Sequence, residues 1–153
     1  MSYKKIINGV EYSIFSSVRF FNNFILMVDW GGSRGFHDLD TCNHNVFMIN
    51  HSGEFVWQVR RDDSVRGEGW WDVLHAHARE IGEDGARRPF TYFVINYPDG
   101  GNNINPDTGS PPDHAIWTPG ATIWLMGSAY QKYILDPETG IATNVTQGNP
   151  RPW

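Results

Sequence analysis

The chain has 153 residues and a mass of 17.5 kDa, with 12 basic and 17 acidic side chains and a formal net charge of −5. This length suits one domain, the single cysteine excludes an intrachain disulfide and a Cys-rich zinc module, and a charged fraction of 19% excludes a coiled coil. The net negative charge argues against an extended nucleic-acid-binding surface. Aromatic residues make up 14% of the chain.

The N-terminal stretch predicts no secretory signal. Two lysines are present, but Asn8, Gly9 and Glu11 interrupt the apolar residues that a signal would need. The longest apolar run, 24–28, is far shorter than the roughly 20 residues of a membrane-spanning helix. We therefore expect a cytoplasmic protein without membrane association.

Strand-type composition dominates the first part of the chain. β-Branched and aromatic residues predict strands at 10–15 and 23–30, with a turn at Asn22-Asn23. Residues 46–50 and 55–60 flank a short loop with Gly53, which predicts a hairpin. Alternation along this hairpin puts Trp57 on the core face.

The pattern changes to helical over 72–81, where Asp72 predicts the N-cap and Gly82 stands just past the end. Strand signals return at 91–97 and are followed by a polar segment, 98–112, that predicts a long loop. Three more strands are predicted at 122–126, 132–135 and 141–145, with Trp124 expected in the core. The domain organisation predicted is one β-rich domain over 1–153, with halves at about 10–60 and 90–146, a helical insertion at about 70–85 and an extended tail at 147–153.

Two stretches, 45–59 and 131–145, match in kind, because each is a strand, an Asn or Asp, a turn with Gly and a second strand. Residues 135–140 (LDPETG) resemble the hairpins of quinoprotein-type and kelch-like β-propeller blades. The resemblance covers about 60 residues and implies two four-stranded blades. Two blades cannot close a ring, so it also implies a homo-oligomer, such as three chains around a six-bladed ring. The alternative is a monomeric β-sandwich or small barrel. Both are mainly β folds of antiparallel sheets with one short helix.

Residues 37–44 combine side chains that ligate divalent metals. His37, Asp38, Asp40 and His44 would form a hydrolase site, with His75, His77 or His114 completing it. The spacing matches no established metal signature, and on a helix His75 and His77 face different ways. A polar turn is the favoured interpretation, and Cys42 lacks an oxyanion-hole motif.

The polar loop carries oxygen ligands at Asp99, Asn103, Asn105 and Asp107, which could hold calcium, but the spacing departs from calcium loops and favours a solvated loop. No metal site is favoured, and the candidates are His37, Asp40, His44 and Asp107. No cofactor motif is found: the phosphate-binding glycine patterns are absent from the sequence. The short basic pairs at 60–61 and 87–88 are interpreted as rim residues rather than as an electrostatic binding stripe.

Several aromatic residues lie beside Gly, Pro or Asp, where loops are expected. Large flat side chains in loops suit protein recognition or stacking on sugar rings. We expect the loops at 30–36, 66–71 and 97–118 to form a recognition surface. The candidate binding residues are Trp30, Arg34, Phe36, Trp70, Trp71 and Trp117.

The sequence therefore favours a non-enzymatic binding module for a protein partner, with a glycan as the second choice. The alternatives left open are a metal-dependent hydrolase that uses the His/Asp site and a structural subunit of a homo-oligomeric assembly.

Overall fold

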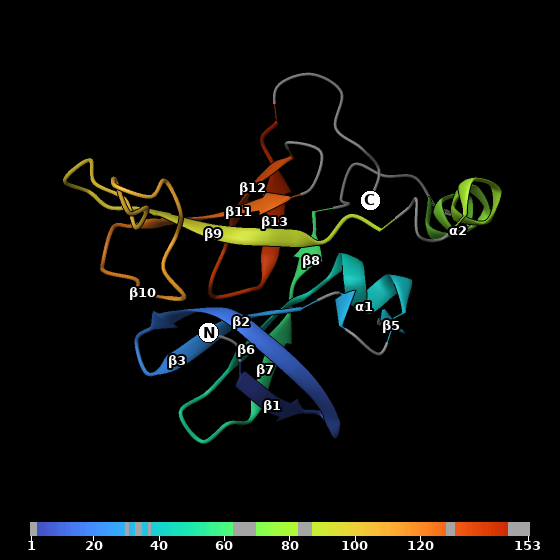
Figure 1. The fold of residues 1–153 in the computed structure, drawn as a ribbon, viewed down its shortest axis with the longest axis horizontal. Helices are drawn as coiled ribbons and strands as arrows, with labels where there is room; N and C mark the ends of the chain where they lie inside the picture. Colours follow the sequence, from blue (N-terminus) through green and yellow to red (C-terminus); the bar gives the residue numbers. More distant parts are fainter. Residues whose placement is uncertain are drawn as a thin grey trace.

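The computed structural model describes residues 3–29, 31–32, 35–36, 38–62, 70–82, 87–127 and 131–146; of residues 31, 32, 35, 36, 39, 70, 71, 74 and 75 it describes the backbone only. The described chain forms two antiparallel sheets that lie one above the other, with two short helices at one end (Figure 1). The sheets do not close into a barrel. The predicted class, a mainly β fold of antiparallel sheets, is confirmed.

The first sheet has six strands. Five of them follow the order β1 (Tyr3–Ile7), β2 (Val10–Phe20), β3 (Asn23–Val28), β6 (Val46–Ile49) and β7 (Phe55–Gln58). The sixth, β10 (His114–Ile116), pairs in parallel with β2. A two-stranded ribbon, β4 (Gly31–Gly32) and β5 (Gly35–Phe36), and helix α1 (Leu39–Asn43) lie between β3 and β6 in the chain.

The second sheet has five strands, in the order β8 (Arg60–Arg61), β13 (Ile141–Asn144), β12 (Lys132–Leu135), β11 (Thr122–Gly127) and β9 (Phe90–Asn96). Helix α2 (Trp70–Ile81) separates β8 from β9 in the chain. Each sheet is thus built around a four-stranded antiparallel meander, β2-β3-β6-β7 in one and β9-β11-β12-β13 in the other. These meanders have the strand number of a propeller blade, while the propeller resemblance itself stays a prediction.

The two meanders exchange short strands. β8 continues directly from β7 but pairs with β13 of the second sheet, and β10 comes from the second half but pairs with β2 of the first. Trp57 of β7 also donates its indole N–H to the carbonyl of Pro137, in the turn before β13. The two halves are therefore interlocked through backbone pairing as well as through packing.

The main core fills the space between the sheets. Both sheets contribute the alternate residues of their inner faces, such as Ile25 and Met27 from one and Ile123 and Leu125 from the other. Asn45 is fully buried among them: its side chain donates to the carbonyls of Val28 and Phe90 and accepts from the Phe90 N–H. This one amide ties β9 to the first sheet.

A second, smaller core covers the outer face of the six-stranded sheet. The pairing of β2 with β3 shifts between Ile14 and Ser16, so Phe15 is an extra residue that changes the face to which the following side chains point. Before this bulge Tyr12 and Ile14 pack on the outer face with Leu26, whereas after it Val18 enters the main core. The first hairpin, β1–β2, is thereby folded over the sheet.

Several sequence expectations are corrected. The structure contains a second helix, α1, and four strands that were not predicted, β1, β4, β5 and β10. Helix α2 begins at Trp70 rather than just after Asp72, although Gly82 ends it with a φ of 81° as expected. Trp124 is half-buried on the outer face of its strand, between buried neighbours on the inner face, so its assignment to the core was wrong. Among the described residues no helix is long and apolar enough to cross a membrane.

Candidate functional site

Three aromatic rings meet at the end of the molecule opposite the helices. They belong to Phe20 and Phe21, at the turn between β2 and β3, and to Trp117, directly after β10. The centroids of Phe20 and Trp117 are 4.7 Å apart, and those of Phe21 and Trp117 are 5.1 Å apart. Phe20 is buried and Trp117 half-buried, but Phe21 is 63% exposed. We call these three residues the end cluster.

Backbone and side-chain hydrogen bonds hold the end cluster in place. The Trp117 N–H donates to the carbonyl of Arg19, and the indole N–H donates to the carbonyl of Ala121 at 2.8 Å. Arg19 donates from Nε to the carbonyl of Phe21 at 3.1 Å. The position of Phe21 is therefore supported from both neighbouring strands.

Phe21 has a φ of 53°, in the left-handed region. A bulky L-residue there is strained by roughly 1–2 kcal/mol, because Cβ approaches the following carbonyl. Another tight turn of the first sheet, Asn8-Gly9 between β1 and β2, also has positive φ angles, 52° and 77°. Asparagine and glycine adopt this conformation readily. Asparagine or glycine would suit the backbone at position 21 better than phenylalanine, so the conformation of the turn does not explain why Phe21 is there.

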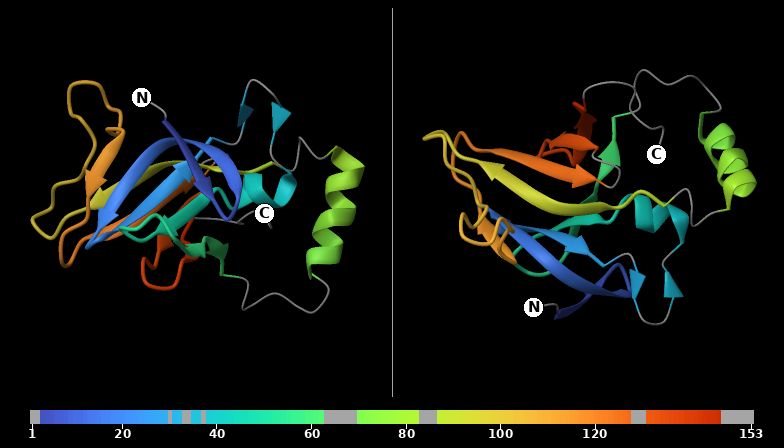
Figure 2. Two further views of the ribbon diagram at one scale, coloured as in Figure 1. Left: turned by 90° about the horizontal axis from the view of Figure 1, so that it is seen from below. Right: turned by 45° about the horizontal axis from the view of Figure 1, so that its top comes forward.

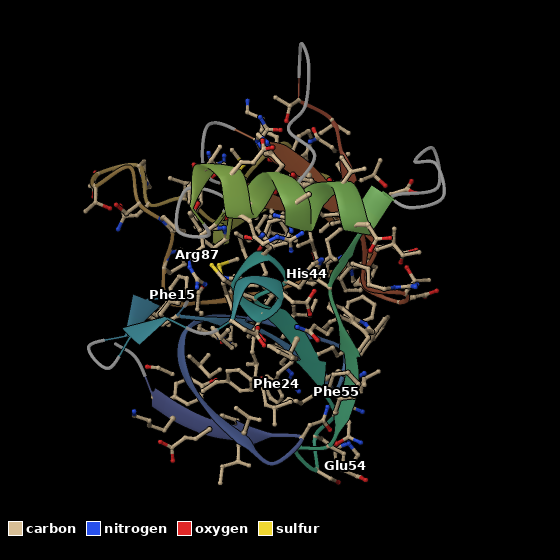
Figure 3. All side chains as sticks on the ribbon, turned by 90° about the vertical axis from the view of Figure 1, so that its right-hand side faces the viewer. Phe15, Phe24, His44, Glu54, Phe55 and Arg87 are labelled. Carbon is tan, nitrogen blue, oxygen red and sulfur yellow. The ribbon has the colours of Figure 1, made fainter. Side chains whose placement is uncertain are left out.

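A groove of about 530 Å³ runs beside β7, on the side of the molecule that faces the viewer in Figure 3. Trp57 and Gln58, which point to opposite faces of the sheet, both line it, so the groove follows the edge of the strand rather than one face. The other lining residues come from α1 and its end, from β7 and β8, and from the turn before β13: Asp40, His44, Phe55, Val59, Arg60 and Thr139.

His44 and Asp40, both predicted as site residues, meet at this groove. Nδ1 of His44 lies 2.7 Å from the Asp40 carbonyl oxygen and 3.4 Å from Asp40 Oδ1. Because a carbonyl oxygen only accepts, Nδ1 carries the proton. The imidazole is 10% exposed as a side chain, and Gln58 donates to the His44 carbonyl at 3.0 Å. The pair therefore closes the C-terminal end of α1 against β7.

Asp38 has a structural role at the start of α1. Its side chain is the N-cap of α1 and accepts the N–H of Thr41 at 2.7 Å. The side chain of His37 lies outside the described residues, as does that of His75. His77 is exposed on α2. His114, on β10, contacts Ser17 of β2, with 2.7 Å between His114 Nδ1 and Ser17 Oγ. Within the described part of the chain, no three His, Cys, Asp or Glu side chains are grouped as metal ligands would be.

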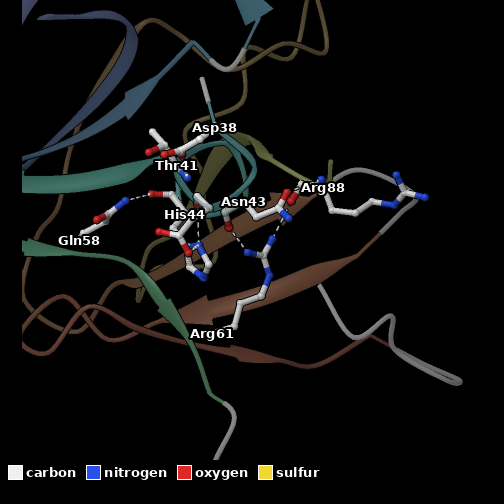
Figure 4. A network of polar contacts seen from close by, with 8 residues as sticks. Asp38, Thr41, Asn43, His44, Gln58, Arg61 and Arg88 are labelled. Atoms are coloured by element: carbon white, nitrogen blue, oxygen red, sulfur yellow. Dashed lines mark hydrogen bonds and ion pairs between the residues drawn. The ribbon is translucent and has the colours of Figure 1, made fainter. Parts of the chain in front are cut away.

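Figure 4 shows the polar network that surrounds α1. Arg61 donates to the carbonyls of Asn43 and Arg88 and to the hydroxyl of Tyr133, and its guanidinium carbon lies 4.3 Å from the Phe90 ring centroid. Burial lowers the pKa of Arg61. Arg61 is half-buried and joins α1, the start of β9 and β12.

Cys42 lies within this region and is fully buried. Burial raises the pKa of its thiol, while a hydrogen bond from Arg87 and the charges of Arg87 and Arg61 act in the opposite direction. Desolvation is the largest of these effects, so the thiolate is disfavoured. This environment is typical of a structural cysteine rather than of a nucleophile.

The polar loop after β9 uses its oxygens internally. Asp99, Asn102 and Asn105 each accept a backbone N–H two residues ahead, and Asn105 thereby binds the N–H of Asp107. Asn103 accepts the Ile95 N–H at 2.8 Å and donates to the Phe93 carbonyl. These are side-chain turns and a cap on the open edge of β9, and they account for much of the polar composition of the loop.

The candidate binding residues do not all gather in one place. Trp30 and Arg34 lie outside the described residues, and of Phe36, Trp70 and Trp71 the backbone alone is described. The ribbon β4–β5 and helix α2 lie at one end of the molecule, while the 97–113 loop and β10, which directly precedes Trp117, lie at the other (Figures 1 and 2). Phe21 and the edge of β7 are not among the site residues predicted from the sequence.

Comparisons with protein-family models, with curated proteins and with solved structures found no match.

Proposed function

We propose that this protein is a binding module that recognises a partner protein through the end cluster. The observation that carries the proposal is Phe21, a strained aromatic residue that is 63% exposed yet fixed against Trp117. Strain of this kind persists where the surrounding structure enforces it, and such sites are frequently functional. A rigid exposed aromatic ring also loses little side-chain entropy on binding.

The neighbourhood of Phe21 has the composition of a protein-binding hot spot. Aromatic residues and arginine are enriched at such sites, and Arg19 is exposed next to the cluster. Ile116 pairs with Arg19 across the sheet and is 53% exposed. An apolar ring with an adjacent cation and an aliphatic rim suits a partner protein with a complementary apolar pocket.

The end cluster is less suited to binding a glycan than to binding a protein. A tryptophan that binds sugars typically offers a free ring face and its N–H. The Trp117 ring is in contact with two other rings, and its N–H already donates to Ala121. These contacts support a protein partner before a glycan.

Site-specific photo-crosslinking tests the proposal. A benzophenone amino acid is placed at position 21 in one sample and at Thr143, exposed on β13, in a second. Both proteins are irradiated in an extract of the source cells. The expected result is a discrete protein adduct from position 21 that position 143 does not give. Equal adducts from both positions would contradict the proposal.

The captured protein is then purified and titrated with wild type, Phe21→Asn and Thr143→Ala by calorimetry. Asparagine tolerates the left-handed conformation, so Phe21→Asn removes the ring and keeps the turn. We expect Kd to rise at least tenfold for Phe21→Asn and to stay unchanged for Thr143→Ala. An unchanged Kd for Phe21→Asn, or glycan-array binding that depends on Phe21, would refute a protein-binding end cluster.

A further inference from the structure

The edge of β7 is a second candidate binding surface, separate from the end cluster. Among the described residues β7 pairs with β6 and with no strand on its other side. Val59 donates its N–H to the carbonyl of Val46, so the N–H and C=O of Gln58, one residue earlier, point away from β6. These backbone groups face the side on which the 530 Å³ groove lies.

Two other edges that the structure describes, those of β9 and β1, are protected. On β9, Asn103 caps Ile95 and Phe93, and Asn45 caps Phe90. On β1 the sequence carries Lys4 and Lys5, and charged side chains discourage edge pairing. By contrast, β7 reads Phe-Val-Trp-Gln, without a charge or a proline. Phe55 and Val56 are 40% and 44% exposed.

We propose that the β7 edge binds a short extended segment of a partner protein, which adds to the first sheet as an antiparallel or parallel strand. The unpaired backbone of Gln58 specifies an extended main chain, since only another strand offers N–H and C=O groups at the matching spacing. The pairing shift between Met48 and Ile49 interrupts the edge near Val56. The added strand therefore spans only about three to five residues.

The side chains along the groove define the chemistry of this segment. Phe55 offers apolar surface at one end of β7. At the other end Arg60 is exposed, and no ion pair to Arg60 occurs among residues 3–29, 38–62, 70–82, 87–127 and 131–146. We infer a segment in which an apolar side chain lies beside Phe55 and an acidic side chain reaches Arg60. This surface shares no residue with the end cluster, so each proposal stands or fails by itself.

Gln58→Pro is the variant that tests the edge. Proline removes the outward N–H of Gln58 and leaves the bonds between β6 and β7 in place, as it does on natural edge strands. The matched control is Gln58→Ala, which loses the side-chain bond to His44 but keeps the backbone N–H. Amide exchange of Val59 reports whether β6–β7 pairing survives in both variants.

Random heptapeptides displayed on phage are selected on the wild type, with counter-selection on Gln58→Pro. We expect enriched peptides with alternating apolar residues and one acidic residue. As synthetic peptides they should bind at least tenfold more weakly to Gln58→Pro and within twofold of wild type to Gln58→Ala. The Gln58 amide should exchange rapidly in the free protein and slowly in the complex. Arg60→Glu should abolish the preference for an acidic residue.

Three outcomes would overturn the proposal: no peptide enriched over the counter-selection, equal affinity for wild type and Gln58→Pro, or a concentration-dependent dimer that Gln58→Pro abolishes while no peptide binds. The last result would make a second copy of the chain the occupant. If Gln58→Pro does not fold, N-methylation of the central amides of the selected peptide replaces it. Unchanged affinity of the methylated peptides would then exclude strand addition.

Discussion

The outer face of the six-stranded sheet is covered by the chain's own first hairpin, whereas the outer face of the five-stranded sheet carries half-buried side chains such as Trp124 and Ile134. Both sheets are built on antiparallel meanders, and both contribute one face to the main core. The difference arises at Phe15, where one extra residue bends β2 and lets β1 fold back. One bulge thus gives the first sheet a second core that the other sheet lacks among its described residues.

The contact between the sheets should be the most sensitive part of the molecule. Asn45→Ala leaves three buried backbone groups, on Val28 and Phe90, without partners. At about 1–3 kcal/mol for each of the three groups, we expect a loss of at least about 3 kcal/mol in the free energy of unfolding. Urea unfolding followed by tryptophan fluorescence measures it. A loss below about 1 kcal/mol would show that Asn45 does not hold the two sheets together.

The two outer faces are compared directly by a pair of alanine variants. Leu26 is 1% exposed in the second core of the first sheet, and Ile134 is half-buried on the second sheet. We expect Leu26→Ala to destabilise by about 3 kcal/mol and Ile134→Ala by about 1 kcal/mol, because only the first leaves an enclosed cavity. The same urea titration is used for both. Equal losses would mean that the outer faces are covered alike.

The matched hairpins differ at their turn glycines. Gly53 and Gly140 have φ angles of 83° and 79°, but a Cβ on Gly140 would lie 2.6 Å from the Trp57 ring, whereas on Gly53 it meets the end of the Lys5 side chain at 3.2 Å. Strain alone gives about 1 kcal/mol for Gly53→Ala. The added clash raises the expected loss for Gly140→Ala to about 2–3 kcal/mol. Thermal unfolding of the two variants measures both losses. A larger drop in Tm for Gly53→Ala than for Gly140→Ala would contradict this order.

A similarly small effect is expected at the exposed edge of β9. Asn103→Ala removes two hydrogen bonds at a half-buried site where water can replace them, so we expect a loss of about 1 kcal/mol. The Ile95 amide should also exchange faster, without a change at Phe90, which Asn45 caps. Accelerated exchange along the whole strand would indicate that the loop holds β9 as a unit.

Much of the layout could be predicted from the sequence, because strand composition and turn residues are local signals. Strands from 23 to 28 and from 132 to 135 are found where expected, and Gly82 ends a helix. The first hairpin was not predicted, although Asn8-Gly9 is a strong turn signal. The two lysines of β1 weaken its strand-type composition. Of the candidate site, Asp40 and His44 were named and do meet, but as a cap beside β7.

The sequence by itself determined that the chain is mainly β, with a repeated hairpin, a polar loop and an excess of aromatic residues. Only the tertiary structure decided what those residues do. Trp57 is buried and Trp124 is not, since the inner face of each strand is set by its partners; Phe21 is exposed because a turn holds it outward. The open edge of β7 likewise depends on which strand lies beside it, and pairing between distant segments leaves no periodic signal in either one.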